Sequence, residues 1–116
     1  MTRHEAERRG RRGEQVAALW LRLKGWRIHD QRVRTPRGEV DLIARRGRTL
    51  AFIEVKTRAR IIDAQLLLDA FALRRVASAV ELLAPRYTRP SAAIRIDAIF
   101  CAPWQRPRHL ENVWHG

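Results

Sequence analysis

The chain has 116 residues and a formal net charge of +12, so residues 1–116 are predicted to form a single basic domain with a modest hydrophobic core. A charge of this size favours a polyanionic partner, nucleic acid above all, and a membrane-surface helix fits less well because the basic residues are spread along the whole chain. We find no secretory signal and no apolar run long enough to span a membrane, and the single cysteine excludes an internal disulfide, so a cytoplasmic location without a membrane partner is expected.

The N-terminal part is predicted to be a basic arm followed by a helix. Residues 1–12 are rich in arginine and interrupted by glycine, which indicates a flexible or weakly helical arm. A helix should then run from about residue 13 to residue 24 and end at Gly25. Four apolar residues recur at helical spacing and should form its buried stripe: Val16, Leu19, Trp20 and Leu23. Glu14 is either a favourable charge near the positive helix end or an extra carboxylate directed at a site elsewhere.

The next predicted elements are three strands. Residues 26–33 alternate as a strand does, and residues 35–38 form the turn that follows. A tight turn at Gly47 and Arg48 divides the remaining stretch, Gly38–Arg58, into two strands, because glycine supplies the positive φ that a two-residue loop needs.

The register of this hairpin gathers charged residues on one face. Side chains alternate along a strand, so the turn at residues 47–48 places Asp41 opposite Glu54. Glu39 and Lys56 lie opposite each other on the same face. The other face should be core and carries five apolar residues: Val40, Leu42, Ala51, Ile53 and Val55. Facing carboxylates repel one another unless a cation lies between them.

Asp41 and Glu54 are therefore predicted to bind Mg²⁺ or Mn²⁺, with the backbone carbonyl of Val55 as a third oxygen ligand. Such a cation lowers the pKa of a bound water and polarises a phosphate, which is the chemistry of phosphodiester cleavage. Lys56, one of two lysines among 24 basic residues, would orient the water or stabilise charge on the phosphate in the transition state.

Other catalytic chemistries fit the sequence less well. The glycines form no phosphate-binding GxxxxGK[ST] loop. Cys101 has no evident histidine partner in the sequence, and Ser78 and Ser91 stand in no nucleophile-elbow context.

A second helix is predicted from about residue 64 to residue 83, ended by Pro85. Its apolar face comprises Leu66, Ala70, Leu73, Val76 or Ala77, Val80 and Leu83. Arg74 and Arg75 lie beside that face and are either solvated charges or, with Arg58 at the end of the hairpin, contacts to nucleic-acid phosphates.

Residues 92–102 are predicted to form a last strand, in which Asp97 is expected to be structural and to pair only weakly with Arg95. A strand, a helix and a further strand after a hairpin favour a right-handed crossover in a mixed sheet. The predicted fold class is α/β, with helices flanking a central sheet.

Several motifs resemble the bacterial YraN-like family, which is grouped with the PD-(D/E)xK nucleases, close to archaeal Holliday-junction resolvases and RecB-type nucleases. They are Gly13-Glu14, Gly25-Trp26, Gly38-Glu39-Val40-Asp41-Leu42-Ile43-Ala44, Phe52-Ile53-Glu54-Val55-Lys56-Thr57-Arg58, Arg95-Ile96-Asp97 and Leu110-Glu111-Asn112. The resemblance covers nearly the whole chain and implies a restriction-endonuclease-like core with the order α-β-β-β-α-β.

The resemblance also implies roles for individual residues. Asp41 and Glu54 correspond to metal ligands and Lys56 to the catalytic lysine, and Glu14 resembles the helix glutamate that completes a resolvase-type site. Glu39 is then either a residue just outside the metal ligands or a partner of Lys56, rather than a metal ligand itself.

The predicted function is a Mg²⁺-dependent endonuclease that acts on DNA, with branched DNA among its candidate substrates. Two alternatives stay open: a non-catalytic nucleic-acid-binding module on the same fold, and an interaction subunit of a DNA-processing assembly. A homodimer is expected if the enzyme cuts a two-fold junction, although the sequence carries no decisive interface signal.

Overall fold

The computed structural model describes residues 2–61 and 70–115, which form a mixed sheet between two helices. The elements are α1 (Arg3–Leu23), β1 (Arg27–Thr35), β2 (Gly38–Arg46), β3 (Thr49–Thr57), α2 (Ala70–Tyr87), β4 (Ala93–Cys101) and β5 (Arg108–Leu110). The strands lie side by side in chain order, β3 and β4 pair in parallel, and the other neighbours are antiparallel. The predicted α-β-β-β-α-β order is confirmed, and β5 is an addition that the sequence did not predict.

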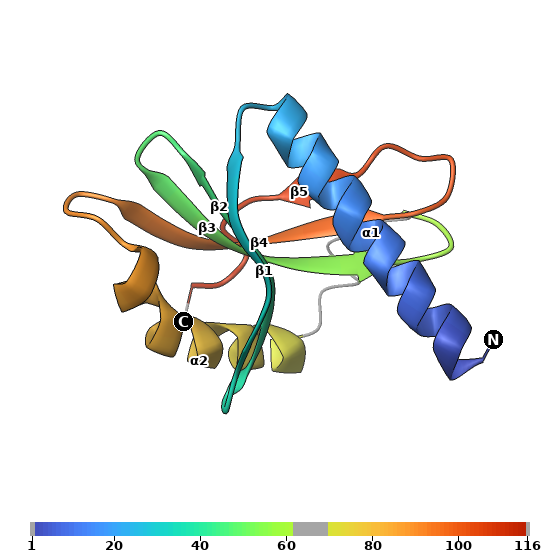
Figure 1. The fold of residues 1–116 in the computed structure, drawn as a ribbon, viewed down its shortest axis with the longest axis horizontal. Coiled ribbons are helices and arrows are strands. Elements are labelled where there is room, and N and C mark those ends of the chain that lie inside the picture. The colour runs from blue at the N-terminus through green and yellow to red at the C-terminus, as the bar shows by residue number, and fades with distance from the viewer. Residues whose placement is uncertain (1, 62–69, 116) are drawn as a thin grey trace.

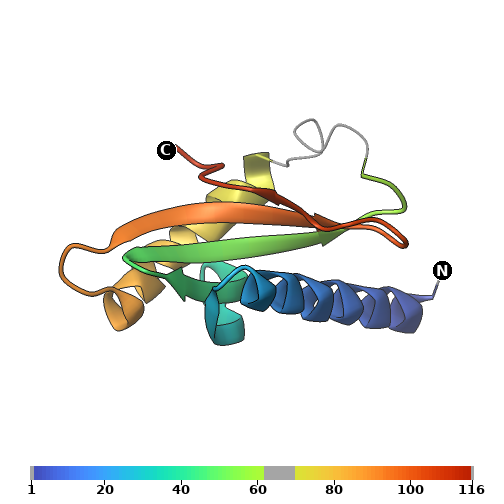
Figure 2. The ribbon, with the colours of Figure 1, turned by 90° about the horizontal axis from the view of Figure 1, so that it is seen from above.

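The two helices cover opposite faces of the sheet, so the molecule has three layers (Figures 1 and 2). The core on the α1 side consists of Ala17, Ala18, Leu21, Trp26, Leu42, Ala44, Ala51, Ile53, Ile99 and Cys101. The core on the α2 side consists of Val40, Ile43, Leu50, Phe52, Leu73, Val76, Ala79, Val80, Leu83 and Ile96. Neither helix, as far as the structure describes them, is long and apolar enough to cross a membrane.

Helix α1 begins at Arg3, ten residues before the predicted start, so most of the predicted arm is part of the helix. The start is set by a capping box, in which the hydroxyl of Thr2 accepts a 3.1 Å hydrogen bond from the N–H of Glu5, and the carboxylate of Glu5 accepts from the N–H of Thr2. The predicted end is confirmed, because Gly25 has a φ of +90° and follows the last turn.

The predicted buried stripe of α1 was wrong. Val16, Leu19 and Leu23 are 46%, 56% and 75% exposed, and Trp20 is half-buried. The face against the sheet consists instead of small residues and one leucine: Gly13, Ala17, Ala18 and Leu21. Small side chains let the helix backbone approach the strands closely, and this gain outweighs the larger apolar area of the predicted stripe.

The predicted hairpin register is confirmed from Arg46 and Thr49 at the turn to Leu42 and Ile53, and Gly47 has the expected positive φ of +60°. The predicted assignment of residues to the two faces of the hairpin was only partly right, because Val40 belongs to the core on the α2 side. The ladder between β2 and β3 ends at Leu42 and Ile53, and β2 beyond this point follows β1, which turns sharply at Arg32 with a φ of +52°.

Helix α2 continues through Pro85 to Tyr87, whereas the sequence predicted that Pro85 would end it. The extra turn is stabilised by Tyr87, whose hydroxyl donates a 2.8 Å hydrogen bond to Asp30 and whose carbonyl accepts one of 2.7 Å from Arg45. These contacts offset the hydrogen bond that proline cannot donate. The predicted first turns, at residues 64–69, lie outside the described residues.

Asp97 forms a stronger network than predicted. Its carboxylate is fully buried and accepts hydrogen bonds from Arg95 at 3.0 Å, from the N–H of Asn112 at 2.9 Å, and lies 2.7 Å from Nε2 of His109. The arginine is long enough to fold back over two residues, a reach that backbone spacing alone underestimates. Although burial raises the pKa of Asp97, its hydrogen bonds with His109, Asn112 and Arg95 hold that pKa below its usual value. The network joins β5 and the C-terminal segment to β4.

Candidate active site

The candidate site lies where β2 and β3 separate. Instead of a further main-chain pair, the N–H of Val55 donates a 2.8 Å hydrogen bond to Oδ2 of Asp41. The gap between the strands opens into a cavity of about 320 Å³, lined by Glu39, Asp41, Glu54, Lys56, Arg75 and Val76. The cavity therefore brings together three predicted site residues of the hairpin, the predicted outer residue Glu39 and one of the predicted phosphate-binding arginines.

Lys56 and Glu54 form an ion pair inside this cavity, with 2.7 Å between Nζ and Oε1. Their side chains are 28% and 13% exposed, so the pair is partly shielded from water. Glu39, which the resemblance paired with Lys56, forms its ion pair with Arg34 instead, at 3.6 Å. Glu54 is thus the carboxylate that holds the lysine in place.

Asp41 carries a strongly perturbed carboxyl group, whose pKa is raised from 3.8 to about 7. Burial is the largest cause, and the negative charges of Glu14, Glu54 and Glu39 add to it, while the hydrogen bond from Val55 opposes it. A carboxyl group that is costly to ionise and lies in a cleft is a typical feature of functional sites. A bound cation would remove that cost.

Glu14, on α1, lies beside the first cavity rather than in its lining. It lines a second cavity of about 260 Å³ together with Gly10, Arg11, Arg32, Arg34 and Glu39. Glu39 lines both cavities, and the charge of Glu14 contributes to the pKa of Asp41, so the two cavities are neighbours. The carboxylate of Glu14 pairs with Nε of Arg32. The alternative of a mere helix-terminal charge is wrong, because Glu14 lies in the middle of α1.

Two glycines fix the helices against the strands beside these carboxylates. A Cβ atom at Gly13 would collide with the hydroxyl of Thr57, so α1 packs directly on the end of β3. A Cβ atom at Gly38 would lie 2.9 Å from the backbone oxygen of Arg75, so α2 packs equally closely on the start of β2. Glu14 and Glu39 are the residues that follow these glycines, and their positions depend on both contacts.

The residues of the first cavity fit a divalent cation whose coordination shell would consist of two carboxylates and several waters. Among the described residues, no group of three His, Cys, Asp or Glu side chains is close enough to hold a metal ion by itself. Mg²⁺ does not require such a cage, because it commonly keeps several waters beside one or two carboxylates. Asp41 and Glu54 would supply those carboxylates, and the raised pKa of Asp41 shows that its ionised form is costly without a cation beside it. The carbonyl of Val55 stays a predicted ligand.

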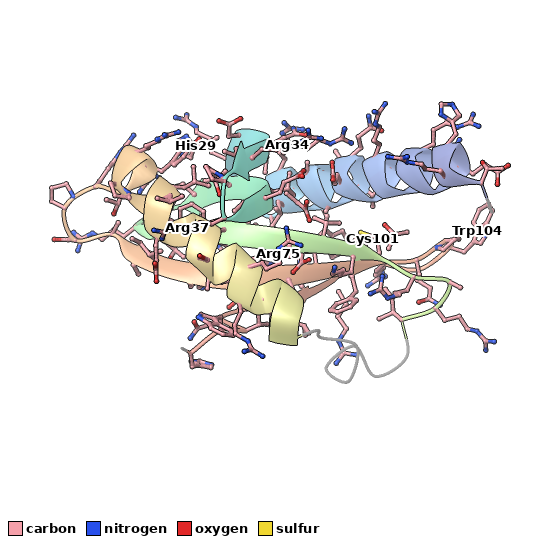
Figure 3. All side chains as sticks on the ribbon, turned by 90° about the horizontal axis from the view of Figure 1, so that it is seen from below. His29, Arg34, Arg37, Arg75, Cys101 and Trp104 are labelled. Atoms are coloured by element: carbon pink, nitrogen blue, oxygen red, sulfur yellow. The ribbon has the colours of Figure 1, made fainter. Side chains whose placement is uncertain are left out.

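The predicted phosphate-binding arginines are not gathered in one place. Arg75 lines the first cavity from α2, and Figure 3 shows it over the strands. Arg74 is exposed beside it, outside the lining of the cavity. Arg58 follows the end of β3, where its N–H donates to the carbonyl of Cys101 at 2.8 Å and its guanidinium to the carbonyl of Thr57 at 2.9 Å. Of the three arginines, Arg75 is therefore best placed for a phosphate in the cavity.

Two arginines of β1 were missed by the sequence reasoning. Arg32 and Arg34 line the second cavity and pair with Glu14 and Glu39. Their spacing of two residues was a signal, since it places both on one side of a strand. The backbone at Arg32 is left-handed, and this conformation sets the direction of the Arg32 side chain. An arginine in the sequence does not signal it, because glycine and asparagine are the residues that usually adopt it.

Comparisons with known proteins give one family and one fold. The sequence profile described as "Uncharacterised protein family UPF0102" matches residues 13–101. The UPF0102 protein of Sphingopyxis alaskensis is 62% identical over 114 residues, covering 98% of each chain. The UPF0102 protein of Rhizorhabdus wittichii is 60% identical over 114 residues, covering 98% of this chain and 97% of its own.

A solved structure also resembles the chain: Hjc of Archaeoglobus fulgidus, a Holliday junction resolvase from an archaeal hyperthermophile. The two superpose with a TM-score of 0.59 at 19% identity, over 86% of this chain and 73% of the resolvase. At this identity the likeness concerns the fold, and it confirms the predicted restriction-endonuclease-like core.

Proposed function

Because the chain belongs to the UPF0102 family, as its resemblance to YraN-like proteins predicted, and has a resolvase-like fold, we propose that it is a DNA-binding endonuclease that requires Mg²⁺ or Mn²⁺. The observation that carries this proposal is the meeting of Asp41, Glu54 and Lys56 in one cavity where β2 and β3 separate. Two carboxylates and a lysine beside an arginine are the groups that phosphodiester hydrolysis needs.

Each residue has a distinct task in this proposal. Asp41 and Glu54 would hold a divalent cation, which would supply an activated water and polarise the phosphate. Lys56, fixed by its ion pair with Glu54, presents an ammonium group to the charge that develops on the phosphate oxygens. Arg75 at the rim of the cavity binds a phosphate and keeps the strand in place.

The second cavity adds arginine side chains from α1 and β1 beside the site. Arg11, Arg32 and Arg34 line it, so a DNA backbone that enters the first cavity meets further guanidinium groups on the α1 side. Glu14 is placed to hold Arg32 and to add negative charge beside Asp41, which strengthens the attraction for a cation. The net charge of +12 supports a polyanionic substrate of this kind.

A cleavage assay with matched substrates tests the proposal. Purified protein is incubated with duplex, flapped and four-way-junction DNA of shared sequence, with Mg²⁺, with Mn²⁺ or with EDTA. We expect metal-dependent cleavage that is abolished in Asp41→Asn and Lys56→Ala, while Glu81→Gln, an exposed carboxylate on α2, cleaves like the wild type. Branched DNA is the first substrate to test, because a solved structure with this fold is that of a Holliday junction resolvase. Binding without cleavage in every metal condition would contradict the proposal.

A non-catalytic DNA-binding module is the second candidate. The ion pair between Lys56 and Glu54 favours it, because it neutralises Glu54 without any metal. This candidate predicts DNA binding that weakens with salt, needs no divalent cation and survives Glu54→Gln. A homodimer and a cytoplasmic location belong to either candidate as predictions.

A further inference from the structure

A separate cavity of about 400 Å³ lies on the α1 side, where β4 leads into β5. Val16, Pro103 and Trp104 form its apolar walls, and Arg12 and Thr57 provide polar atoms. The side chain of Trp104 is fully exposed, with a relative accessibility of 103%. Figure 3 shows Trp104 at the end of the molecule where α1 begins, and Figure 2 shows the turn between β4 and β5 at the same end.

We propose that this cavity binds an unpaired nucleobase, which stacks on the indole of Trp104 while Arg12 binds the adjoining phosphate. The inference rests on the proposed nucleic-acid function. A volume of about 400 Å³ falls within the range of small-ligand pockets, roughly 300–1,000 Å³. An aromatic platform beside a cation is the arrangement that single-stranded nucleic acid recognises, because every base has a π-face and every nucleotide a phosphate.

The positive charge around this cavity favours a nucleic-acid strand over a second copy of the chain. Among the described residues that line the cavity there is no carboxylate, and Arg12 is the charged group. Arg106, two residues beyond Trp104, is exposed in the same turn, and Arg58 directly follows Thr57. A second copy of this chain would also carry a net charge of +12 and would be repelled, whereas a nucleic-acid strand would be attracted.

Some residues that line this cavity are direct sequence neighbours of residues of the candidate active site. Thr57 directly follows Lys56 in β3, and successive side chains of a strand point to opposite faces. Gly13, which also lines the cavity, directly precedes Glu14. In this inference, a strand whose phosphate lies beside Lys56 continues around the end of β3 and places a base farther along the strand on Trp104. DNA in which an unpaired base adjoins a duplex satisfies both sites at once.

Fluorescence anisotropy in EDTA tests this inference without cleavage. The dissociation constants of a blunt duplex and of the same duplex with a single-stranded arm are measured for the wild type, Trp104→Ala, Trp104→Phe and Leu23→Ala. Leu23 is an exposed apolar residue of α1 outside the cavity lining and is the matched control. We expect the wild type to prefer the armed duplex and Trp104→Ala to weaken binding of that duplex about 5- to 150-fold, the range of one base–aromatic stack. Trp104→Phe and Leu23→Ala should keep the preference.

The outcomes separate this inference from the proposed function. Wild-type protein that binds neither DNA would remove the proposed function and the inference with it. Wild-type protein that binds DNA, together with a Trp104→Ala variant of unchanged preference, would overturn the inference alone. Sedimentation of the free proteins addresses the apolar surface directly: a dimer that dissociates in both Trp104→Ala and Leu23→Ala would identify a protein interface and overturn the nucleobase site. Because Trp104 is fully exposed, its replacement leaves the core intact.

Discussion

The backbone N–H of Val55 donates a 2.8 Å hydrogen bond to Oδ2 of Asp41, just beyond the point where the main-chain ladder between β2 and β3 ends. A side chain of one strand thus takes the place of a main-chain acceptor for the other. This bond holds the Asp41 carboxylate next to the strand segment that carries Glu54 and Lys56. The relative positions of the three side chains therefore depend on the divergence of two strands rather than on a loop.

Replacing Asp41 by asparagine should stabilise the metal-free protein at high pH. The folded pKa of Asp41 is about 7 against 3.8 unfolded, so the folded state binds the proton more tightly and the free energy of unfolding falls as pH rises from about 4 to about 7. The free energy of unfolding falls by up to about 4 kcal/mol over this pH range. Asparagine keeps an acceptor for Val55 without the charge.

Urea denaturation in EDTA at pH 5, 6, 7 and 8 measures this effect. Asp41→Asn should be more stable than the wild type by about 2–4 kcal/mol at pH 8, and the difference should shrink toward pH 5. Glu81→Gln, at an exposed position, should follow the wild type. Parallel curves for Asp41→Asn and wild type at all pH values would show that Asp41 titrates normally.

The stabilisation by Mg²⁺ should itself depend on pH. A protonated Asp41 cannot bind a cation, so the rise in Tm should be larger at pH 8 than at pH 6. At ten times the dissociation constant, binding contributes about 1.4 kcal/mol, which corresponds to a rise in Tm of about 6 °C for a domain of this size. Thermal melts with and without Mg²⁺ test this, and Asp41→Asn should show no shift. Equal shifts at both pH values would place the cation elsewhere.

Arg75→Ala should weaken DNA binding more than Arg74→Ala. Arg75 lines the cavity and Arg74 does not, although both lie on α2 and are exposed. The loss of one phosphate contact reduces the slope of log affinity against log salt by about 1. Affinities measured at several salt concentrations separate this loss from a general effect of charge, for which the two variants would behave alike.

Asp97→Ala should destabilise the protein by about 3–5 kcal/mol, because it leaves Arg95 and His109 without their buried partner. The pKa of Asp97 is lowered, so its contribution is present above the unfolded pKa and is lost as pH falls through the folded one. Urea denaturation at pH 7 measures the loss. Since Asp97 lies outside the candidate site, DNA cleavage by the folded variant should persist, and a selective loss of cleavage would assign it another role.

The hairpin could be predicted from sequence because its determinants are local. The turn at Gly47 and the alternation of side chains set the register from Arg46 to Leu42. Beyond Leu42 the pairing is decided by contacts with β1, and the misassignment of Val40 follows from the turn at Arg32. The candidate site lies in this less predictable part, where the strands separate.

Helix α1 shows that the spacing of apolar residues does not by itself identify the buried face of a helix. Two faces of the helix have helical spacing, one with Val16, Leu19 and Leu23 and the other with Gly13, Ala17 and Leu21. Hydrophobicity favoured the first, but close packing on the sheet selected the second. The capping residues Thr2 and Glu5 were readable in the sequence and were outweighed by Gly10 and Gly13, which look like helix breakers.

In the function that we propose, Asp41 and Glu54 hold a divalent cation beside Lys56. A crystal grown with Mn²⁺ and measured near its absorption edge tests this directly. We expect an anomalous peak in the cavity under Arg75, within bonding distance of oxygens of both carboxylates. Saturating Mn²⁺ with no peak there, and with Lys56 still the partner of Glu54, would contradict it.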